Sequence, residues 1–124
     1  MEPTVVPLAS VRPRRRNEDY DVARLIDRAR CGSELLMGVE WFEPGETTKW
    51  SFEAEDRSDP DEEWFGERHE TYFVLEGRLR LSWDGGAVEF GAGDGVHMPP
   101  GNRYRMESLG PETARIVYAI APSL

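Results

Sequence analysis

The short spacing of turn-forming residues is the feature of this sequence that most constrains its fold. From about residue 20 onward, Gly, Pro and Asp recur at short intervals, and the apolar residues between them alternate with polar ones or form short runs. This pattern is typical of strands joined by tight turns, whereas an amphipathic helix needs a longer segment with a period of about 3.6 residues. We therefore expect an all-β chain without a long helix, folded as a sandwich or barrel.

The expected strands share an apolar pattern bounded by turn residues. They are 22–27, 35–42, 47–55, 70–77, 78–86, 87–90, 95–99, 104–108 and 114–121. The segment "VARLID" also fits one helical turn, but the turn "RARCGSE" that follows it favours a hairpin with 35–42. Asp84, Gly85 and Gly86 stand between two alternating runs and predict a tight hairpin with residues at positive φ.

The length of 124 residues suits a single domain. We divide it into an N-terminal arm (1–20) and a barrel (21–124), with an acidic loop at 53–69 that carries Trp64 and Phe65 and is placed to close a pocket. The arm holds the basic cluster "VRPRRR", for which we favour a solvated position over docking on a partner subunit.

The charge balance and the apolar runs bound the class of protein. A net charge of −9 argues against nucleic-acid binding. No apolar run is long enough to span a bilayer and no secretory signal is visible, so we expect a cytoplasmic protein with no membrane association. Cys31 is the only cysteine, which excludes an internal disulfide and a multi-cysteine zinc site within one chain.

Two spaced motifs resemble those of the cupin superfamily. Glu70 and Gly77 match the end of its first motif, and Gly93, Pro99 and Gly101 match its second. The resemblance covers roughly residues 35–121 and implies a double-stranded β-helix, or jelly roll, with an interior pocket that commonly holds a divalent metal. It also implies a homodimer, in which residues 4–11 could cover an exposed sheet edge.

The sequence departs from the cupin motifs at the metal ligands. The second motif's histidine and asparagine fall on Tyr104 and Ser108. The first motif's histidine pair falls on one of three pairs: Trp64 and Gly66, Glu63 and Phe65, or Ser51 and Glu53. We prefer the last pair because "KWSFEAE" alternates like a strand. Strand alternation turns His69 and His97 away from the interior.

The inherited ligand positions would offer a metal only oxygen donors, namely Glu53, Glu70 and Tyr104. Such donors suit Mn²⁺, Mg²⁺ or Fe, but the lost histidines favour a pocket without metal. The resemblance implies further pocket residues that are aromatic or polar: Trp41, Trp50, Ser51, Phe52, Tyr72 and Trp83. Arg78 and Arg80 would indicate an anionic ligand if they faced inward, and we favour a solvated face for them.

The remaining chemistry centres on Glu70. Burial in an apolar barrel would raise its pKa and make it a useful acid or base, with Tyr104 as its partner. We therefore predict an enzyme of lyase or isomerase type acting on a small polar metabolite. Three alternatives stay open: a structurally satisfied Glu70, a non-catalytic protein that binds or senses a metabolite, and a weakly metallated, oxygenase-like cupin.

Overall fold

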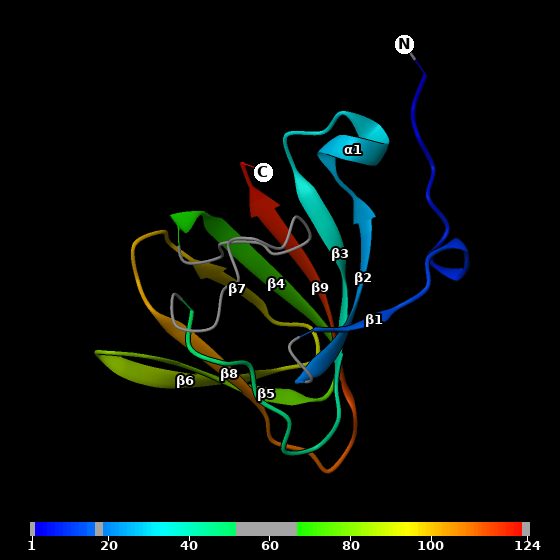
Figure 1. The fold of residues 1–124 in the computed structure, drawn as a ribbon. Coiled ribbons are helices and arrows are strands. Elements are labelled where there is room, and N and C mark those ends of the chain that lie inside the picture. Colours follow the sequence, from blue (N-terminus) through cyan, green and yellow to red (C-terminus); the bar gives the residue numbers. More distant parts are fainter. Residues whose placement is uncertain (1, 17–18, 52–66, 123–124) are drawn as a thin grey trace.

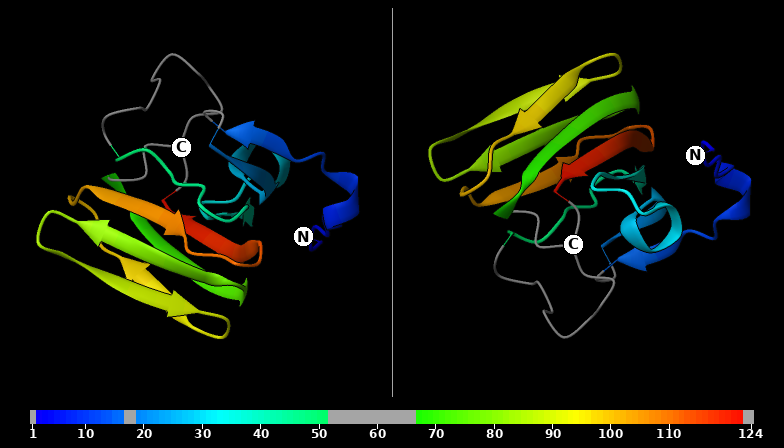
Figure 2. Two further views of the ribbon diagram at one scale, coloured as in Figure 1. Left: turned by 90° about the horizontal axis from the view of Figure 1, so that it is seen from below. Right: turned by 90° about the horizontal axis from the view of Figure 1, so that it is seen from above.

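Two antiparallel sheets face each other across a shared interior in the computed structural model, which describes residues 2–16, 19–51 and 67–122 (Figures 1 and 2). The larger sheet has six strands in the order β1-β2-β3-β9-β4-β7, and the smaller has three in the order β6-β5-β8. The strands are β1 (Arg14–Arg16), β2 (Tyr20–Ile26), β3 (Leu36–Phe42), β4 (His69–Glu76), β5 (Arg78–Trp83), β6 (Gly86–Gly91), β7 (Gly95–Met98), β8 (Tyr104–Ser108) and β9 (Ala114–Ala121).

The chain passes between the sheets in the manner of a jelly roll. Strand β4 pairs with β7 and β9 in the larger sheet, although β5 and β6, which follow it directly in sequence, lie in the smaller sheet. The all-β jelly-roll prediction is therefore confirmed. Two short helices complete the described part of the fold: the 3-10 helix η1 (Leu8–Ser10) and α1 (Arg28–Cys31), a single turn between β2 and β3. Among the described residues no helix has the length and apolar character needed to cross a membrane.

The expected strand at 47–55 is wrong for residues 47–51, and 52–55 lie outside the described residues. Thr47 forms one isolated bridge with Glu107, and no regular strand follows it. Side-chain hydroxyl groups of this segment bond to the backbone of β8. The Oγ1 of Thr48 accepts from the backbone N–H of Met106 at 2.9 Å, and the Oγ of Ser51 accepts from that of Tyr104 at 2.8 Å, so side chains replace part of the ladder along β8.

The predicted hairpin between β5 and β6 is confirmed, with Trp83 paired to Gly86. Its turn differs from expectation, because neither Gly85 nor Gly86 has a positive φ. The two glycines make room for the indole of Trp83 instead. A Cβ on Gly85 would lie 3.1 Å from Trp83 Nε1, and one on Gly86 would lie 3.4 Å from Trp83 Cζ2.

The basic cluster near the N-terminus contributes to the sheet. We placed residues 1–20 in an arm, but β1 pairs with β2 through Arg14 opposite Val22 and Arg16 opposite Tyr20. Arg16 and Tyr20 are both buried. The segment before β1 extends away from the barrel in Figure 1, and most of the acidic loop at 53–69, with Trp64 and Phe65, lies outside the described residues.

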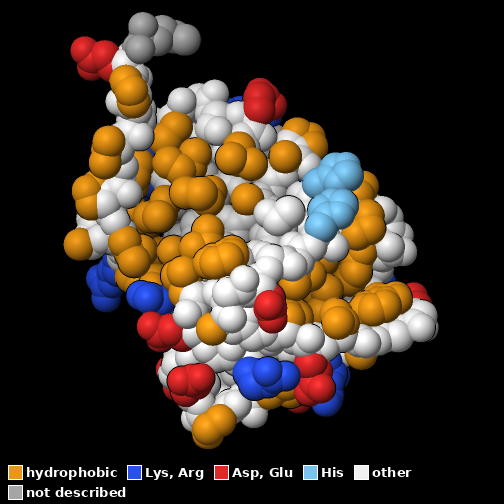
Figure 3. Space-filling model, turned by 180° about the vertical axis from the view of Figure 1, so that it is seen from behind, with side chains coloured by type: hydrophobic (Ala, Val, Ile, Leu, Met, Phe, Trp, Pro, Cys, Tyr) orange, Lys and Arg blue, Asp and Glu red, His pale blue; other side chains and the backbone are white. Residues whose placement is uncertain are grey.

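The outer face of the larger sheet carries many apolar side chains, and Figure 3 shows them around the two histidines. Phe73 and Leu75 on β4 are 48% and 38% exposed. Antiparallel sheets usually present a polar face to water, so an apolar outer face suits contact with another surface. The homodimer expected from the sequence stays a prediction.

One glycine permits a close crossing on the inner face of the larger sheet. Gly38 on β3 pairs with Arg24 on β2 and with Tyr118 on β9. A Cβ at Gly38 would overlap the carbonyl oxygen of Ala23 and lie 2.7 Å from the Tyr118 hydroxyl oxygen. Because position 38 has no side chain, the phenol of Tyr118 can cross β3.

We predict that Gly38→Ala destabilises the fold, because the backbone at Ala23 cannot yield in the way a flexible side chain can. The expected loss in free energy of unfolding is about 1–3 kcal/mol, measured by urea denaturation. Gly95→Ala is the matched control within a strand, since its Cβ would meet only the Tyr72 carbonyl oxygen at 3.9 Å. Equal losses in the two variants would contradict the close crossing.

Candidate functional site

Polar side chains gather on the inner face of the larger sheet. Leu36, Phe42, Val74 and Ile116 on this face make an ordinary apolar core. Between them lie buried residues that carry ionisable groups: Arg16, Tyr20, Glu40, Glu70, Tyr72 and Tyr118. Strand alternation and register bring them to one face, because Val22 pairs with Glu40 and Tyr118 pairs with Tyr72. The interior is therefore a phenol-rich and carboxyl-rich cluster.

Two tyrosines of this cluster are paired with arginines. Arg16 Nη1 donates to the Tyr20 hydroxyl oxygen at 2.6 Å, and the Tyr20 ring stacks on Phe42 with centroids 4.5 Å apart. The guanidinium of Arg24 donates to the Tyr118 hydroxyl oxygen across Gly38. In both pairs the phenol oxygen accepts from arginine, which leaves the phenol O–H to donate elsewhere.

Burial sets the proton affinity of these phenols. It raises the pKa of Tyr20 and of Tyr118, and the positive charge of Arg16 or Arg24 offsets part of that rise. The pKa of Tyr72 is also raised, first by burial and then by the negative charge of Glu70. All three phenols therefore stay protonated near neutral pH, so they can act as hydrogen-bond donors.

The two carboxyl groups of the cluster have different partners. The Tyr72 hydroxyl donates to the Glu70 carboxylate. Oε2 of Glu40 has no hydrogen-bond partner among the described residues. The pKa of Glu40 is raised well above its ordinary value, first by burial and then by repulsion from Glu70, against the attraction of Arg16. The cluster thus combines one carboxyl group that accepts a hydrogen bond from a phenol with another that favours its protonated form.

The structure brings some sequence-predicted site residues together and separates others. Glu70 and Tyr72 meet on the inner face. The Tyr104 hydroxyl, at the start of β8, instead donates to the Pro99 carbonyl oxygen at 3.1 Å and accepts from Asn102 Nδ2 at 3.1 Å.

The other predicted pocket residues lie at the edges or on the opposite face. Trp41 points to the opposite face from Glu40, its neighbour on β3. Trp50 is half-buried beneath the Arg103 guanidinium, 4.6 Å from its ring centroid, and Ser51 bonds to the backbone of β8. Trp83 covers the β5–β6 turn. Phe52 and Glu53 lie outside the described residues.

The sequence analysis did not place Arg16, Arg24 or Glu40 in the site. Arg16 stood in a cluster that suggested a solvated arm, yet it is only 7% exposed. Glu40 gave a usable signal, because it has the same parity as Leu36 and Phe42 within a strand that is otherwise apolar. A carboxyl group at such a position predicts a buried ionisable residue.

The two histidines lie on the outer face, as strand parity predicted. Thr71 pairs with His97 and Glu70 with Met98, so His69 and His97 share the side opposite Glu70. His69 Nδ1 and His97 Nε2 are 3.0 Å apart, with ring centroids at 5.3 Å and planes 13° apart. These values place the rings edge to edge and nearly coplanar, so one imidazole donates to the other.

The described donors do not fit the divalent metal that the resemblance implied. Within residues 2–16, 19–51 and 67–122 no group of three or more His, Cys, Asp or Glu is placed to hold a metal ion. The imidazoles face outward, and Arg16 lies close enough to Glu40 and Glu70 to interact with both electrostatically. Of the expected ligands, Glu70 accepts from Tyr72 and the Tyr104 hydroxyl bonds to Pro99 and Asn102.

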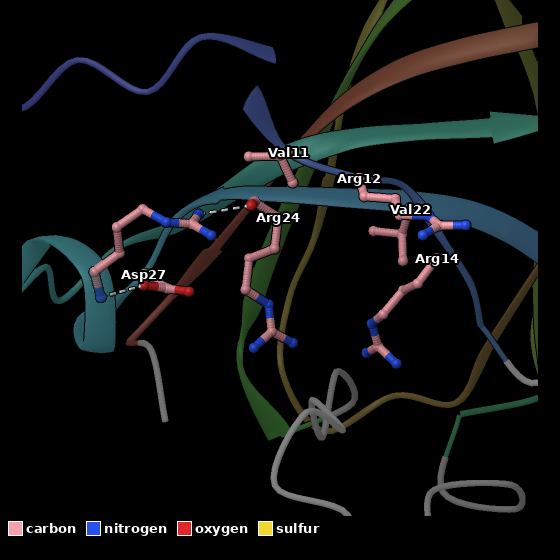
Figure 4. Close-up of a pocket in the computed structure, with 7 residues that line it drawn as sticks. Val11, Arg12, Arg14, Val22, Arg24 and Asp27 are labelled. Carbon is pink, nitrogen blue, oxygen red and sulfur yellow. Dashed lines mark hydrogen bonds between the residues drawn. The ribbon is translucent and has the colours of Figure 1, made fainter. Parts of the chain in front are cut away.

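A pocket opens beside the buried carboxyl and phenol groups, between the N-terminal segment and β2 (Figure 4). Its volume is about 190 Å³. The residues that line it come from the N-terminal segment, β1, β2 and the start of α1: Val11, Arg12, Arg14, Val22, Arg24, Asp27 and Arg30. Arg78 and Arg80 play no part in it, because they are exposed on β5 while Leu79 and Leu81 face inward.

Comparison with known proteins places the chain in a family. Residues 40–120 match the family model described as "Cupin domain". The "Polyketide synthase CurC" of Streptomyces cyaneus is 28% identical over 123 residues, which cover 98% of this chain and 71% of that protein. The polyketide cyclase RemF of Streptomyces resistomycificus superposes with a TM-score of 0.76 at 17% identity, over 98% of this chain and 81% of RemF. KdgF from a Halomonas species gives 0.75 at 10% identity, covering 99% and 96%.

The raised pKa of Glu40 predicts a pH-dependent stability. The pKa of Glu40 is higher in the folded chain than in the unfolded chain, so the folded chain holds this proton more tightly. The resulting contribution to stability is fully present below the ordinary glutamate pKa and is lost as pH rises through the pKa of the folded state. Each unit of elevation corresponds to about 1.4 kcal/mol. Glu40→Gln should therefore stabilise the protein more, relative to wild type, at about pH 8 than at about pH 5.

Urea denaturation at both pH values measures this difference. Glu89→Gln is the control, because the Glu89 side chain is 48% exposed and pairs with Arg80 on the smaller sheet. Identical pH profiles for Glu40→Gln and Glu89→Gln would show that Glu40 is not held protonated.

Proposed function

Since the chain belongs to the cupin domain family, we propose that it is a small-molecule enzyme that catalyses proton transfer on a polyketide-type carbonyl compound. The reaction class is enolisation of a 1,3-dicarbonyl unit followed by intramolecular aldol closure. The observation that carries the proposal is the interior cluster of two carboxyl groups and three protonated phenols. The names of the Streptomyces cyaneus relative and of RemF support the substrate class.

Glu70 is the proposed general base. Its carboxylate takes the proton from the carbon between two carbonyl groups. The electron pair of that C–H bond forms the C=C bond of the enolate, and the π pair of the carbonyl group moves to its oxygen. Tyr72, already hydrogen-bonded to Glu70, holds the carboxylate in place and stabilises its negative charge. We assign this role to Tyr72 in place of Tyr104, because the Tyr104 hydroxyl donates to the Pro99 carbonyl.

The arginine–tyrosine pairs would stabilise the enolate. Each phenol oxygen accepts from a guanidinium, which makes the phenol O–H a stronger donor to an oxyanion. The enolate carbon then attacks a second ketone of the same molecule, a C–C bond forms, and the new alkoxide takes a proton. Glu40 is a suitable donor for that proton, because its raised pKa keeps it protonated. The proton that Glu70 removed then replaces the one that Glu40 gave, so the cycle closes without an oxidant or reductant.

Deuterium exchange tests the proposal at its first step. Methyl acetoacetate in D₂O should exchange its C2 protons faster with the protein than without it, as followed by proton NMR. Glu70→Gln should slow the catalysed exchange by about 10²- to 10⁴-fold, and Tyr72→Phe should slow it less, because it leaves the base in place. Glu89→Gln is the matched control on the outer surface.

Circular dichroism and thermal melts would show whether each variant is folded. No catalysed exchange by wild type would overturn the enzymatic proposal. If the probe nevertheless bound saturably, the chain would be a binding or sensing protein. Full activity in a folded Glu70→Gln variant would remove Glu70 from the reaction.

A further inference from the structure

We propose that the arginine-lined pocket binds an anionic end group of the substrate, a carboxylate or phosphate oxyanion, while the carbonyl chain reaches the interior cluster. This inference rests on the proposed function, because it concerns the same substrate. It adds an anchoring site to the proposed enzyme. Its core is Arg14 on β1 and Arg24 on β2, with Val22 between them.

The charge of the pocket is opposite to that of the protein. Four of the seven lining residues are arginine and one is acidic, whereas the whole chain has a net charge of −9. The acidic member, Asp27, already accepts from the backbone N–H of Arg30 at 2.7 Å. A local concentration of positive charge on a strongly acidic protein favours one class of ligand, an anion.

The two central arginines lie on one face of the sheet. Arg14 pairs with Val22, and Arg24 follows Val22 by two residues, so strand alternation turns both side chains the same way. Figure 4 shows both side chains pointing to the same side of the strands, whereas Arg12 points elsewhere. An oxyanion between two guanidinium groups would be attracted by both. Planar guanidinium groups also match carboxylate and phosphate oxygens in pairs.

Arg30 has a different role, because it fixes the backbone of the pocket wall. Its Nη1 donates to the carbonyl oxygens of Arg24 and Leu25 at 2.9 and 2.8 Å. This holds the end of β2 in place and with it the origin of the Arg24 side chain. The pocket is thus preorganised on one side, which lowers the ordering cost of binding.

The pocket adjoins the interior cluster through Arg24 and Val22. Arg24 lines the pocket and also donates to Tyr118, and Val22 pairs directly with Glu40 on β3. An anion held between Arg14 and Arg24 therefore lies beside the first phenol and the first carboxyl group of the inner face. In the proposed complex, the carbonyl chain extends from the anion toward Glu40 and Tyr118.

Acetoacetate and its methyl ester form a matched pair of probes that differ in one negative charge. Wild type should bind acetoacetate more tightly than the ester, as measured by NMR titration, and added NaCl should reduce this preference. Arg14→Gln should lower the preference by about tenfold or more, because it removes half of the anion-binding pair. Arg80→Gln makes the same charge change on the exposed face of β5 and should leave the preference unchanged.

Competition identifies the source of the anion. Displacement of acetoacetate mainly by inorganic phosphate would support a phosphate-bearing substrate, and displacement mainly by acetate would support a free carboxylic acid. No displacement by either would overturn the anion site. Equal binding of acetoacetate and ester by wild type, or equal loss of preference in Arg14→Gln and Arg80→Gln, would overturn it as well.

Binding and exchange fail separately, so the two proposals can be told apart. Selective binding of acetoacetate that depends on Arg14, without catalysed exchange of either probe, would keep the anion site and reject the enzymatic step. Catalysed exchange of the ester without any preference for acetoacetate would keep the enzymatic step and reject the anion site.

Discussion

The interior of this barrel depends on electrostatic compensation among its buried ionisable groups. Glu40 and Glu70 repel each other, and Arg16 offsets part of that repulsion from the edge of the sheet. Without the guanidinium, two carboxyl groups in an apolar core would have to be protonated or to draw in water. The polar inner face, the protonated state favoured by Glu40 and the donor phenols all follow from this balance.

The fold followed from the sequence because it rests on local patterns. Alternating apolar residues, with turns marked by Gly, Pro and Asp, are enough to predict β9 and the β5–β6 hairpin. The segment at 47–51 could not be predicted in this way, because Thr48 and Ser51 form side-chain bonds to β8 where a ladder was expected. Such bonds depend on a partner more than fifty residues away.

The site was only half predictable, for reasons of register. Glu70 and its inward direction follow from a motif and from strand parity. Its contact with Tyr72 is local, and it could have been read from their spacing of two residues on β4. The roles of Arg16 and Arg24 depend on how β1 pairs with β2 and on the missing side chain at Gly38, which lets Tyr118 reach Arg24. No local pattern indicates that contact.

The short strand β1 supplies two of the arginines on which the site depends. β1 is three residues long and pairs only with β2 in the described sheet, yet it supplies Arg14 to the pocket and Arg16 to the interior. Short edge strands fray at a small free-energy cost, well below that of global unfolding. Each opening would withdraw Arg14 from the pocket and Arg16 from the buried carboxyl groups that it compensates. The fraction of molecules with β1 paired to β2 would therefore set the apparent affinity for an anion. Hydrogen exchange at the three amides of β1 would report that fraction.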